Sequence, residues 1–485
     1  MKVTIAALDK KGNNAPAAVL GALKTLNFQD SESFGVATPL GVVVKKTIND
    51  LRKQDMSSST AIGFAYSNSV VHKKQYCVKL NNGVFIFNGR IYPDTAQADI
   101  TEEIVKKLNE QSYSKTSTAL LEKIDGDFSF HLISSEQIMA GRDAIGVQPL
   151  YFGENTNLVA IASNRKALWR LSIDETQSFP PGNISVASRE GFKFKPVKKI
   201  ELSRPKVTSM QEAAVKLQKL LESSVQKRVS GIREVAVAFS GGLDSSVIAF
   251  LLSKYNLKVH LFHVSLKDRA ETEEAKRAAE DLKLPLHIHL FEESDVEKVL
   301  GKVVELSEEA DPVKASIGVP FYWIAEKTAE AGFKILFAGQ GADELFGGYQ
   351  RYVNEYLKQG AEKAKKMMYE DIIRIHEGNI ERDVKICDYH GVELRLPFMS
   401  YKLVKFVVSL PLELRMEKNP DTKRKLILRK VARDLYLPRS ITEKPKKALQ
   451  YATGTNDALK KIAKKRNTTV REYISQIYIN ERNRT

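Results

Sequence analysis

The segment that most restricts the fold is SGGLDSS (240–246), which directly follows the apolar run VAVAF (235–239). A strand that enters a glycine-rich loop and then a helix is typical of a phosphate-binding site. Gly241 and Gly242 allow backbone N–H groups to approach an anion, and Ser245 and Ser246 add hydroxyl donors. The lysine of the common P-loop is absent, so a different phosphate chemistry is expected. The alternative is a tight turn with an Asp/Ser helix cap.

The second half of the chain alternates between strand-like and helix-like segments. Expected strands are 234–239, 258–266, 284–291 and 334–339, and expected helices include 245–256 and 273–282. This alternation predicts βαβ units and a parallel sheet, in which ligands bind beyond the carboxyl ends of the strands. A second glycine-rich segment, GQGADELFGGY (339–349), also follows a strand. The two loops are therefore expected to share one site.

The first half has a different pattern. GVFIFNGRIY (83–92) is an apolar run expected to turn at Asn88-Gly89, and GDFSFHLIS (126–134) alternates as a half-buried strand that ends near Ile133. A further strand is expected at 158–163, with helices near 101–109 and 115–123. These features predict an α+β domain with antiparallel sheets. The breakers FPPG (179–182) and LSRPKVTS (202–209) place the boundary between domains 1–203 and 210–485.

Cysteine content and hydropathy restrict the compartment. A chain of 485 residues has only two cysteines, Cys77 and Cys387, which form neither a disulfide framework nor a CxxC motif. That usage fits a reducing cytosol. The N-terminus lacks the apolar core of a signal peptide, and no run approaches the roughly 18 apolar residues of a membrane span. A cytoplasmic protein without membrane segments is expected.

The formal net charge of +16 is compatible with binding either nucleic acid or smaller anions such as ATP. The sequence contains neither a zinc finger nor an RNP motif, so a nucleic-acid partner is not expected. A basic run near the C-terminus has helical spacing and is interpreted as a solvated helix face, with a role toward RNA or a partner as the alternative. Its members are Lys460, Lys461, Lys464, Lys465 and Arg466.

Long motifs in both halves carry a family resemblance. SGGLDSS resembles the pyrophosphatase loop of enzymes that split ATP between its α- and β-phosphates. GQGADELFGGY, HGVELRLPFMS (390–400), KRKLILRKVA (423–432) and KPKKALQ (444–450) resemble segments of asparagine synthetases. FNGRIY, DGDFSF, GRDAIGVQPLYFG (141–153), ASNRKAL and FPPG resemble the glutaminase domain of the same enzymes. The resemblance implies an Ntn-hydrolase-like antiparallel sandwich followed by a parallel-sheet ATP-pyrophosphatase domain of the adenine nucleotide alpha hydrolase-like type.

The resemblance also implies a nucleotide site. The first loop would hold the β- and γ-phosphates, Asp244 and Asp343 would share Mg²⁺, and Lys446 would stabilise the departing pyrophosphate. A carboxylate beside phosphates is repulsive unless a cation lies between them, which supports the metal. The residues expected to bind ATP or pyrophosphate are Phe239, Ser240, Gly241, Gly242, Leu243, Asp244, Ser245, Ser246, Val264, Ala338, Gly339 and Lys446.

The acceptor side of the site is less sharply defined by the resemblance. Glu344 and Glu393 are candidates for positioning the acceptor or its attacking amine. For Glu393 the alternative is a structural ion pair with Arg395 or Arg382. For Lys425 and Arg429 a surface or structural role stands beside contact with substrate.

The sequence departs from the family at the glutaminase nucleophile. Glutamine-using members carry a cysteine after Met1, whereas this chain has Lys2, which cannot form a thioester. Asn88 and Gly89 match the oxyanion and substrate loop, and Asp99 is matched to the carboxylate that holds the glutamine amine. No arginine of the glutamine site could be matched. A silent glutaminase domain is therefore expected.

A second departure lies in the synthetase half. Gln340 stands where asparagine synthetases carry a glutamate, so the charge and any general-base role are lost. Ser400 replaces a family aspartate and is interpreted as a minor change. With ATP and Mg²⁺ as cofactors, Gln340, Glu344, Glu393 and Lys446 are the expected catalytic residues.

The leading hypothesis is an ATP-dependent amide-forming ligase that releases AMP and pyrophosphate and uses aspartate and free ammonia. The first alternative is another carboxylate and amine pair, including ring closure as in β-lactam synthetases, although their tyrosine near position 340 is absent. A second is an ATP-binding scaffold or a subunit that receives ammonia from a separate glutaminase. A third is a tRNA-modifying enzyme. A homodimer is also compatible with the resemblance.

Overall fold

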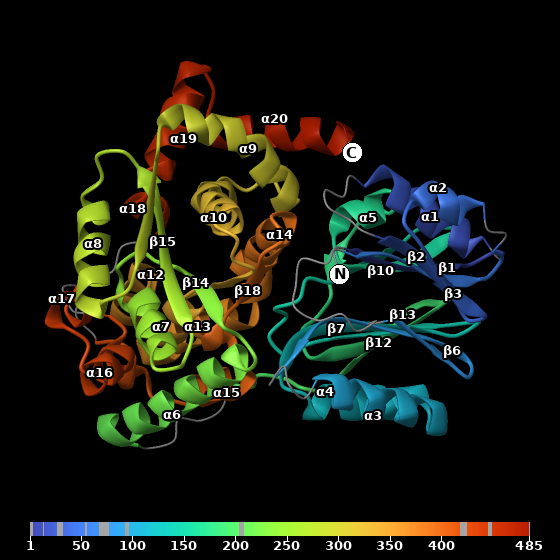
Figure 1. The fold of residues 1–485 in the computed structure, drawn as a ribbon, viewed down its shortest axis with the longest axis horizontal. Helices are drawn as coiled ribbons and strands as arrows, with labels where there is room; N and C mark the ends of the chain where they lie inside the picture. Colours follow the sequence, from blue (N-terminus) through green and yellow to red (C-terminus); the bar gives the residue numbers. More distant parts are fainter. Residues whose placement is uncertain are drawn as a thin grey trace. The chain divides into compact units, whose positions relative to one another are not determined.

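The computed structural model describes residues 3–12, 14–26, 33–53, 56–66, 77–92, 97–202, 208–417, 424–444 and 449–484. The chain divides into two compact units, residues 1–199 with 483–485 and residues 200–482 (Figure 1). This division falls a few residues before the boundary expected at 203–210. In the described part of the chain, no helix is both long and apolar enough to cross a membrane.

The first unit contains two antiparallel sheets. One has the order β11-β9-β10-β1-β4-β2-β3 and the other β13-β12-β8-β7-β6-β5. The first sheet comprises β1 (Val3–Asp9), β2 (Ser33–Thr38), β3 (Gly41–Lys45), β4 (Thr60–Tyr66), β9 (Tyr151–Glu154), β10 (Leu158–Ala162) and β11 (Gln177–Ser178). The second comprises β5 (Cys77–Leu80), β6 (Gly83–Ile91), β7 (Gly126–Ile133), β8 (Ile138–Arg142), β12 (Asn183–Ser188) and β13 (Gly191–Pro196).

Helices cover the outer faces of these sheets. Helices α1 (Ala15–Thr25), α2 (Ile48–Arg52) and α5 (Arg165–Trp169) lie by the first sheet, and α3 (Gln97–Glu110) and α4 (Tyr113–Lys123) lie by the second (Figure 1). A separate apolar cluster, which includes Phe64, Ile86 and Ile133, lies between the sheets. Both faces of β7 are therefore buried. The prediction that this strand is half-buried was wrong, because a four-layer arrangement covers its polar face as well as its apolar face.

The expected turn at Asn88-Gly89 was also wrong. Strand β6 continues through both residues, and its register with β7 pairs Asn88 with Ser129 and Gly89 with Phe128. Gly89 has φ +114°, and a Cβ added there would lie 2.2 Å from the carbonyl oxygen of Asp127. The glycine is thus required by close contact between two strands rather than by a turn.

The segment GRDAIGVQ folds around two buried charges. Arg142 is fully buried and donates hydrogen bonds to the carbonyl oxygens of Gly146, Gln148 and Phe179. The carboxylate of Asp143 accepts hydrogen bonds from the backbone N–H groups of residues 145, 146, 147 and 148. Because buried charges must be fully hydrogen-bonded, these residues stabilise the loop after β8.

A buried histidine makes the stability of this unit sensitive to pH. His131 contacts the Thr4 hydroxyl at 3.1 Å through Nε2, and burial lowers its pKa to about 4. The unfolded imidazole titrates near 6.5. Stability from the neutral ring is therefore present above pH 6.5 and is lost as the pH falls toward 4. The free energy of unfolding should drop by about 2 kcal/mol between pH 7.5 and pH 5 through this group.

Urea unfolding of wild type, His131→Gln and Thr4→Val at both pH values tests this expectation. His131→Gln should lose this part of the pH dependence. Thr4→Val removes the hydrogen bond but keeps the imidazole, so it should retain the dependence. An unchanged pH profile in His131→Gln would contradict the assignment.

The second unit contains one parallel sheet with the order β16-β15-β14-β17-β18. Its strands are β14 (Glu234–Ala238), β15 (Lys258–Leu266), β16 (Leu286–Phe291), β17 (Ile335–Phe337) and β18 (Glu393–Arg395). Four of these strands match the expected segments. The three-residue β18 was missed because it is too short for a periodic pattern.

Two groups of helices surround this sheet, and in each group two helices contact the strands while the others pack on helices of the group (Figure 1). One group is α6 (Met210–Val229), α7 (Leu243–Ser253), α8 (Ala270–Leu282) and α16 (Leu426–Asp434). The other is α9 (Glu293–Ser307), α10 (Pro312–Glu330), α14 (Glu381–Tyr389) and α19 (Thr455–Lys465). The remaining elements are α11 (Ala342–Phe346), α12 (Gln350–Gln359), α13 (Ala361–Ile373), η2 (His376–Ile380), η3 (Pro397–Met399), α15 (Tyr401–Val408), η4 (Leu412–Leu414), α17 (Arg439–Thr442), α18 (Leu449–Ala452) and α20 (Val470–Arg484).

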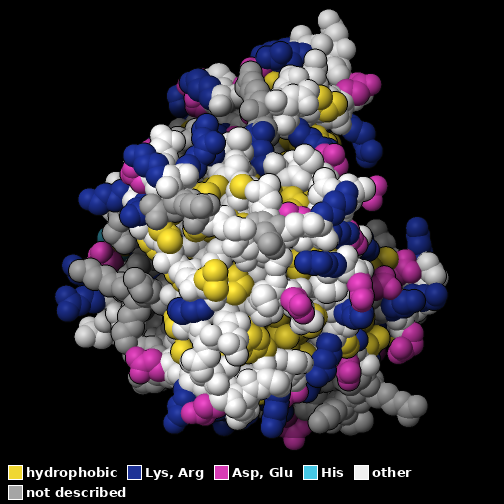
Figure 2. All heavy atoms as spheres, turned by 90° about the vertical axis from the view of Figure 1, so that its right-hand side faces the viewer, with side chains coloured by type: hydrophobic (Ala, Val, Ile, Leu, Met, Phe, Trp, Pro, Cys, Tyr) yellow, Lys and Arg dark blue, Asp and Glu magenta, His cyan; other side chains and the backbone are white. Residues whose placement is uncertain are grey.

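The basic run at 460–466 is partly neutralised by α9. Lys461 forms an ion pair with Glu293, and Arg466 donates through Nε to Glu297 at 3.0 Å. Figure 2 shows Lys and Arg side chains mixed with Asp and Glu over the face that it presents. The two ion pairs with α9 favour a solvated helix face for the run.

Candidate active site

The two glycine-rich loops meet at the carboxyl end of the parallel sheet. Strands β14 and β17 are neighbours, with Val237 paired to Phe337, so the loops that follow them start side by side. A Cβ added to Gly339 would lie 3.0 Å from Cβ of Asp244. Glycine at this position therefore lets the second loop approach the first.

The first loop gathers donors at the N-terminus of α7. Gly241 has φ +65°, and a Cβ there would lie 2.7 Å from Cα of Ala275 in α8. The hydroxyls of Ser240 and Ser245 lie 3.4 Å apart. Ser246 is buried, and its hydroxyl has no hydrogen-bond partner among the described residues. The hydroxyls of Ser240 and Ser245 thus lie together at the positive end of an 11-residue helix, which suits an anion.

Three of the residues expected to bind ATP belong to strands of the parallel sheet or directly follow them. Phe239, Val264 and Ala338 are buried, and the carbonyl oxygen of Phe239 lies 3.0 Å from Nδ1 of His263. Burial lowers the pKa of His263, so this imidazole is neutral at pH 7. These side chains pack within the sheet and support the loop that follows β14.

Lys425 joins the two aspartates that were expected to bind metal. Its Nζ lies 2.5 Å from Oδ2 of Asp244 and 2.7 Å from Oδ1 of Asp343. Burial opposes the charge on this lysine, but the two carboxylates outweigh burial and raise its pKa. The side chain is only 2% exposed, so a surface role for Lys425 is wrong.

The donor set fits a magnesium ion that is bound together with phosphates. The structure brings the carboxylates of Asp244 and Asp343 to one point beside the N-terminus of α7. Within the described ranges, no group of three or more His, Cys, Asp or Glu side chains could hold a metal by itself. Mg²⁺ usually takes one or two carboxylates plus substrate phosphates and water, and two carboxylates beside a phosphate loop meet that need.

Gln340 is held by a buried ion pair. Its side-chain amide donates a hydrogen bond to Oδ2 of Asp383, and Arg382 contacts Oδ1 of the same carboxylate at 2.7 Å. Burial raises the pKa of Asp383, and Arg382 opposes that shift. The amide of Gln340 thus supplies a donor that a carboxylate could not.

Gln340→Glu should therefore be destabilising at alkaline pH. It would place a second carboxylate against Asp383, and one of the two would have to bind a proton. The apparent melting temperature should fall by about 5 °C at pH 8, and less at pH 5, where a shared proton is available. Differential scanning calorimetry measures this, with the exposed Gln350→Glu as the matched control. Equal melting temperatures of Gln340→Glu and wild type at pH 8 would contradict the expectation.

Glu344 belongs to α11, within the second glycine-rich segment. Its Oε1 accepts hydrogen bonds from the Tyr349 hydroxyl at 2.9 Å and from the Asn379 amide at 3.0 Å. Burial, and then the neighbouring Asp343, raise its pKa to about 7. Glu344 is only 4% exposed, so its carboxyl group contacts these two side chains rather than solvent.

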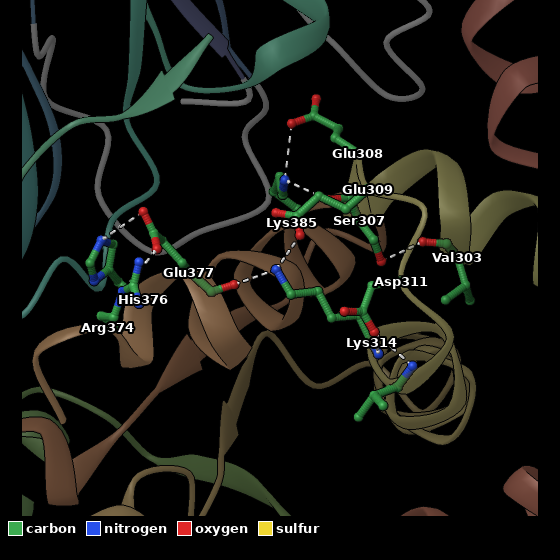
Figure 3. Close-up of polar contacts among 11 residues, drawn as sticks. Val303, Ser307, Glu308, Glu309, Asp311, Lys314, Arg374, His376, Glu377 and Lys385 are labelled. Carbon is green, nitrogen blue, oxygen red and sulfur yellow. Dashed lines mark hydrogen bonds and ion pairs between the residues drawn. The ribbon is translucent and has the colours of Figure 1, made fainter. Parts of the chain in front are cut away.

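An ion-pair network supports the π-helical turn η2, which carries Asn379. Figure 3 shows Lys314 reaching toward η2, where its Nζ donates to the carbonyl oxygen of Glu377 at 2.6 Å. Lys314 also pairs with Glu309, and Lys385 of α14 pairs with the buried Glu308 at 3.0 Å. A π-helical turn is frequently found at a functional site, and here it positions the partner of Glu344.

Protein-family comparison agrees with this arrangement. The asparagine synthase family model matches residues 216–362 and 353–481. The glutamine amidotransferase domain model matches residues 69–170. The chain belongs to the asparagine synthetase family. Its class is accordingly that of the carbon–nitrogen ligases.

Individual relatives show the same pattern. A protein provisionally named glutamine-hydrolyzing asparagine synthetase 1, from Methanocaldococcus jannaschii, is 36% identical over 71% of this chain and 72% of its own length. A glutamine-hydrolyzing asparagine synthetase from Sandersonia aurantiaca is 29% identical over 70% of this chain and 67% of its own. The solved structure of an allosteric regulatory enzyme of purine biosynthesis matches at 12% identity and TM-score 0.35, covering 59% of this chain and 80% of its own. That last similarity is too low to support an argument.

Not every residue expected from the asparagine synthetase resemblance lies at this site. Glu393 stands at the amino end of β18 and forms an ion pair with Arg395 at 2.7 Å. The glycine-rich loops follow the carboxyl ends of their strands, so Glu393 stands at the other end of its strand and forms the ion pair that was its structural alternative. Lys446, which the synthetase family resemblance marks for pyrophosphate, lies outside the described residues.

The glutamine site expected from the resemblance is only partly described. Asn88 is buried within β6, next to Gly89. Lys2 and the side chain of Asp99 lie outside the described part of the structure. The roles of these residues therefore stay predictions from the resemblance.

Two further basic residues lie close to the phosphate loop or to the segment that follows α17: Lys444, which the sequence did not single out, and Arg429, for which a surface or structural role stood beside contact with substrate. Nζ of Lys444 lies 3.2 Å from the carbonyl oxygen of Gly241 and 2.9 Å from Glu274, so it reaches the phosphate loop. Arg429 donates to the carbonyl oxygens of Arg424, Thr442 and Lys444. The motif KPKKALQ contained Lys444, but the sequence had no signal to separate it from the lysines that follow.

Proposed function

We propose that this protein makes asparagine from aspartate, ATP and free ammonia. The observation that carries the proposal is the meeting of Asp244 and Asp343, from two different loops, beside the donors at the N-terminus of α7. In the proposed reaction a carboxylate oxygen of aspartate attacks the α-phosphorus of ATP, and pyrophosphate leaves. Ammonia then attacks the acyl carbon, and AMP leaves.

Each part of the loop region has a role in this scheme. The hydroxyls and N–H groups of residues 240–246 bind the β- and γ-phosphates, with the positive end of α7 behind them. Asp244 and Asp343 would hold Mg²⁺, which supplies charge neutralisation when bound. Lys446 would stabilise the pyrophosphate, and Lys444 holds the phosphate loop through the carbonyl group of Gly241.

The acceptor would bind near the second loop. Gln340 and Glu344 are proposed to position it, since both belong to the segment that follows β17. The side-chain amide of Gln340 is hydrogen-bonded to Asp383, so Gln340 would orient the acceptor rather than act as a base. Glu393 is left out of the proposal because of its pairing with Arg395.

Free ammonia is proposed as the nitrogen donor because of residue 2. A lysine there lacks the thiolate that attacks glutamine in the family, and neither Cys77 nor Cys387 stands near the start of the chain. Burial raises the pKa of both thiols, which makes each a poor nucleophile. A separate glutaminase that supplies ammonia is compatible with the same observation.

The first unit would then serve without glutamine hydrolysis. We propose that it acts as a packing and dimerising partner that protects the acyl-adenylate from water. A fragment starting at residue 201 tests this role, because a soluble and fully active fragment would exclude it. The two free cysteines are consistent with a cytoplasmic location.

The deciding experiment incubates the purified full chain with ATP, Mg²⁺ and aspartate, and adds ammonium or glutamine in parallel. Pyrophosphate and asparagine are measured together. Asparagine formed with ammonium but not with glutamine supports the proposal. Asparagine formed equally well from glutamine would show a working glutaminase. Absence of pyrophosphate in both tubes would favour the second candidate, a ligase that acts on another carboxylate and amine pair. The hydrogen bond from Gln340 to Asp383 is the observation that favours this candidate.

A further inference from the structure

Lys425 is placed by strained backbone. It has φ +63°, a left-handed conformation that is uncommon for a residue with a side chain. Its neighbours fix the turn, since Arg424 donates to the carbonyl oxygen of Gly348 at 2.9 Å and Leu426 N–H donates to that of Arg415 at 3.0 Å. Such strain persists where the surrounding structure holds it, often at functional sites.

A glycine makes room for the lysine side chain. A Cβ added to Gly348 would lie 1.9 Å from Oδ1 of Asp343 and 2.6 Å from Cε of Lys425. The backbone strain at Lys425 and the glycine at 348 therefore serve the same contact. Together they direct one ammonium group to the point where the two loop carboxylates meet.

That point is also where a divalent cation would sit. A magnesium ion binds carboxylate oxygens at about 2.0–2.1 Å. The ammonium nitrogen already lies 2.5 Å and 2.7 Å from one oxygen of each aspartate. A metal ion held by these two carboxylates would compete with the ammonium group for the position between them.

We propose that Lys425 controls the entry of the metal into this site. Without nucleotide, its ammonium group occupies the position between Asp244 and Asp343 and keeps a divalent cation out. When ATP arrives with its metal, the phosphates offer the ammonium group new acceptors, and the flexible four-carbon stem lets it withdraw while the backbone stays in place. Metal binding is thereby coupled to nucleotide binding.

This inference shares one assumption with the proposed function, which is that Asp244 and Asp343 are metal ligands. It adds that the chain discriminates between a free cation and a cation that is bound to a nucleotide. The site of such an enzyme would not bind a metal ion alone. Each cation would enter the site together with the nucleotide that is the substrate of the first step.

The test measures Mn²⁺ binding to the full chain without nucleotide, by the electron paramagnetic resonance signal of free Mn²⁺. Wild type should bind weakly, and Lys425→Met should bind at least about ten-fold more tightly because the competing cation is gone. Lys425→Arg keeps a cation and should remain weak. Lys430→Met removes the same charge from α16, where Lys430 pairs with Asp434, and should leave the affinity unchanged.

Two results would overturn the inference. One is Lys425→Met binding Mn²⁺ no more tightly than wild type, which is the outcome expected if the lysine only stabilises the fold. The other is tight Mn²⁺ binding by wild type without nucleotide, which needs no variant to fold. Lys425→Met combined with Asp343→Asn should lose the gain in affinity.

The outcome is separable from that of the proposed function, because the readout uses neither aspartate nor ammonia. Tighter Mn²⁺ binding by Lys425→Met without asparagine formation by wild type would support the role of Lys425 and refute the choice of acceptor. Asparagine formation by wild type, together with an unchanged Mn²⁺ affinity in Lys425→Met, would support the choice of acceptor and refute the role of Lys425.

Discussion

Asp343→Asn should lower the rate of pyrophosphate release by about 1,000-fold. The carboxylate supplies half of the charge that the structure gathers for a divalent cation, and its oxygen lies 2.7 Å from Nζ of Lys425. An asparagine keeps the shape but removes the charge, so the phosphates lose the cation that offsets their repulsion. Release of pyrophosphate with ATP, Mg²⁺, aspartate and ammonium measures the effect.

The matched control is Asp434→Asn, which removes a carboxylate from the partly exposed pair with Lys430 within α16 and should leave the rate within about two-fold. Asp244→Asn should resemble Asp343→Asn. The double variant should be scarcely slower than either single one, because residues that hold one metal act as a unit. A rate within ten-fold of wild type for Asp343→Asn would show that this carboxylate is not a metal ligand.

Arg429→Met should lower the free energy of unfolding by about 3 kcal/mol and reduce kcat as well. The guanidinium group is 3% exposed and donates to three carbonyl oxygens, those of residues 424, 442 and 444. The first of these carbonyl groups precedes α16, the second belongs to the last residue of α17, and the third follows α17. Loss of the hydrogen bonds to these carbonyl groups would release the chain just before Lys446. Displacement of Lys446 by about 1 Å from the leaving pyrophosphate could lower the rate by about 100-fold.

Arg433→Met is the comparison for Arg429→Met. Arg433 lies on the same helix, is half exposed and contacts Glu443 at 3.4 Å, so its loss should change the free energy of unfolding by less than about 0.5 kcal/mol. Urea unfolding and steady-state kinetics are measured for both variants. If Arg429→Met lowers stability but leaves kcat and KM unchanged, Arg429 stabilises the fold without positioning the segment that contains Lys446.

Local sequence order explains why part of the site could be predicted. SGGLDSS and GQGADELFGGY each follow a strand, and neighbouring parallel strands end at the same edge of a sheet. The contact between Gly339 and Asp244 follows from that geometry. The alternation of strands and helices in the second unit is likewise a local pattern, and four of the five strands were predicted.

Local signals also failed in identifiable ways. Asn-Gly is a strong hairpin signal, yet β6 passes through Asn88 and Gly89 because β7 pairs with it on both sides of the dipeptide. The alternating residues of β7 predicted one exposed face, and a second sheet covers that face. In both places a partner segment more distant in the sequence overrode the local preference.

The sequence by itself determined the family, the two kinds of sheet and the phosphate loop, because these depend on residues adjacent along the chain. Only the tertiary structure decided what fills the space between the aspartates. Lys425 lies 181 positions from Asp244 and stands in a run of basic residues that resembles a surface segment. Its role follows from a left-handed backbone and the space left by Gly348, which bring three distant charges to one point.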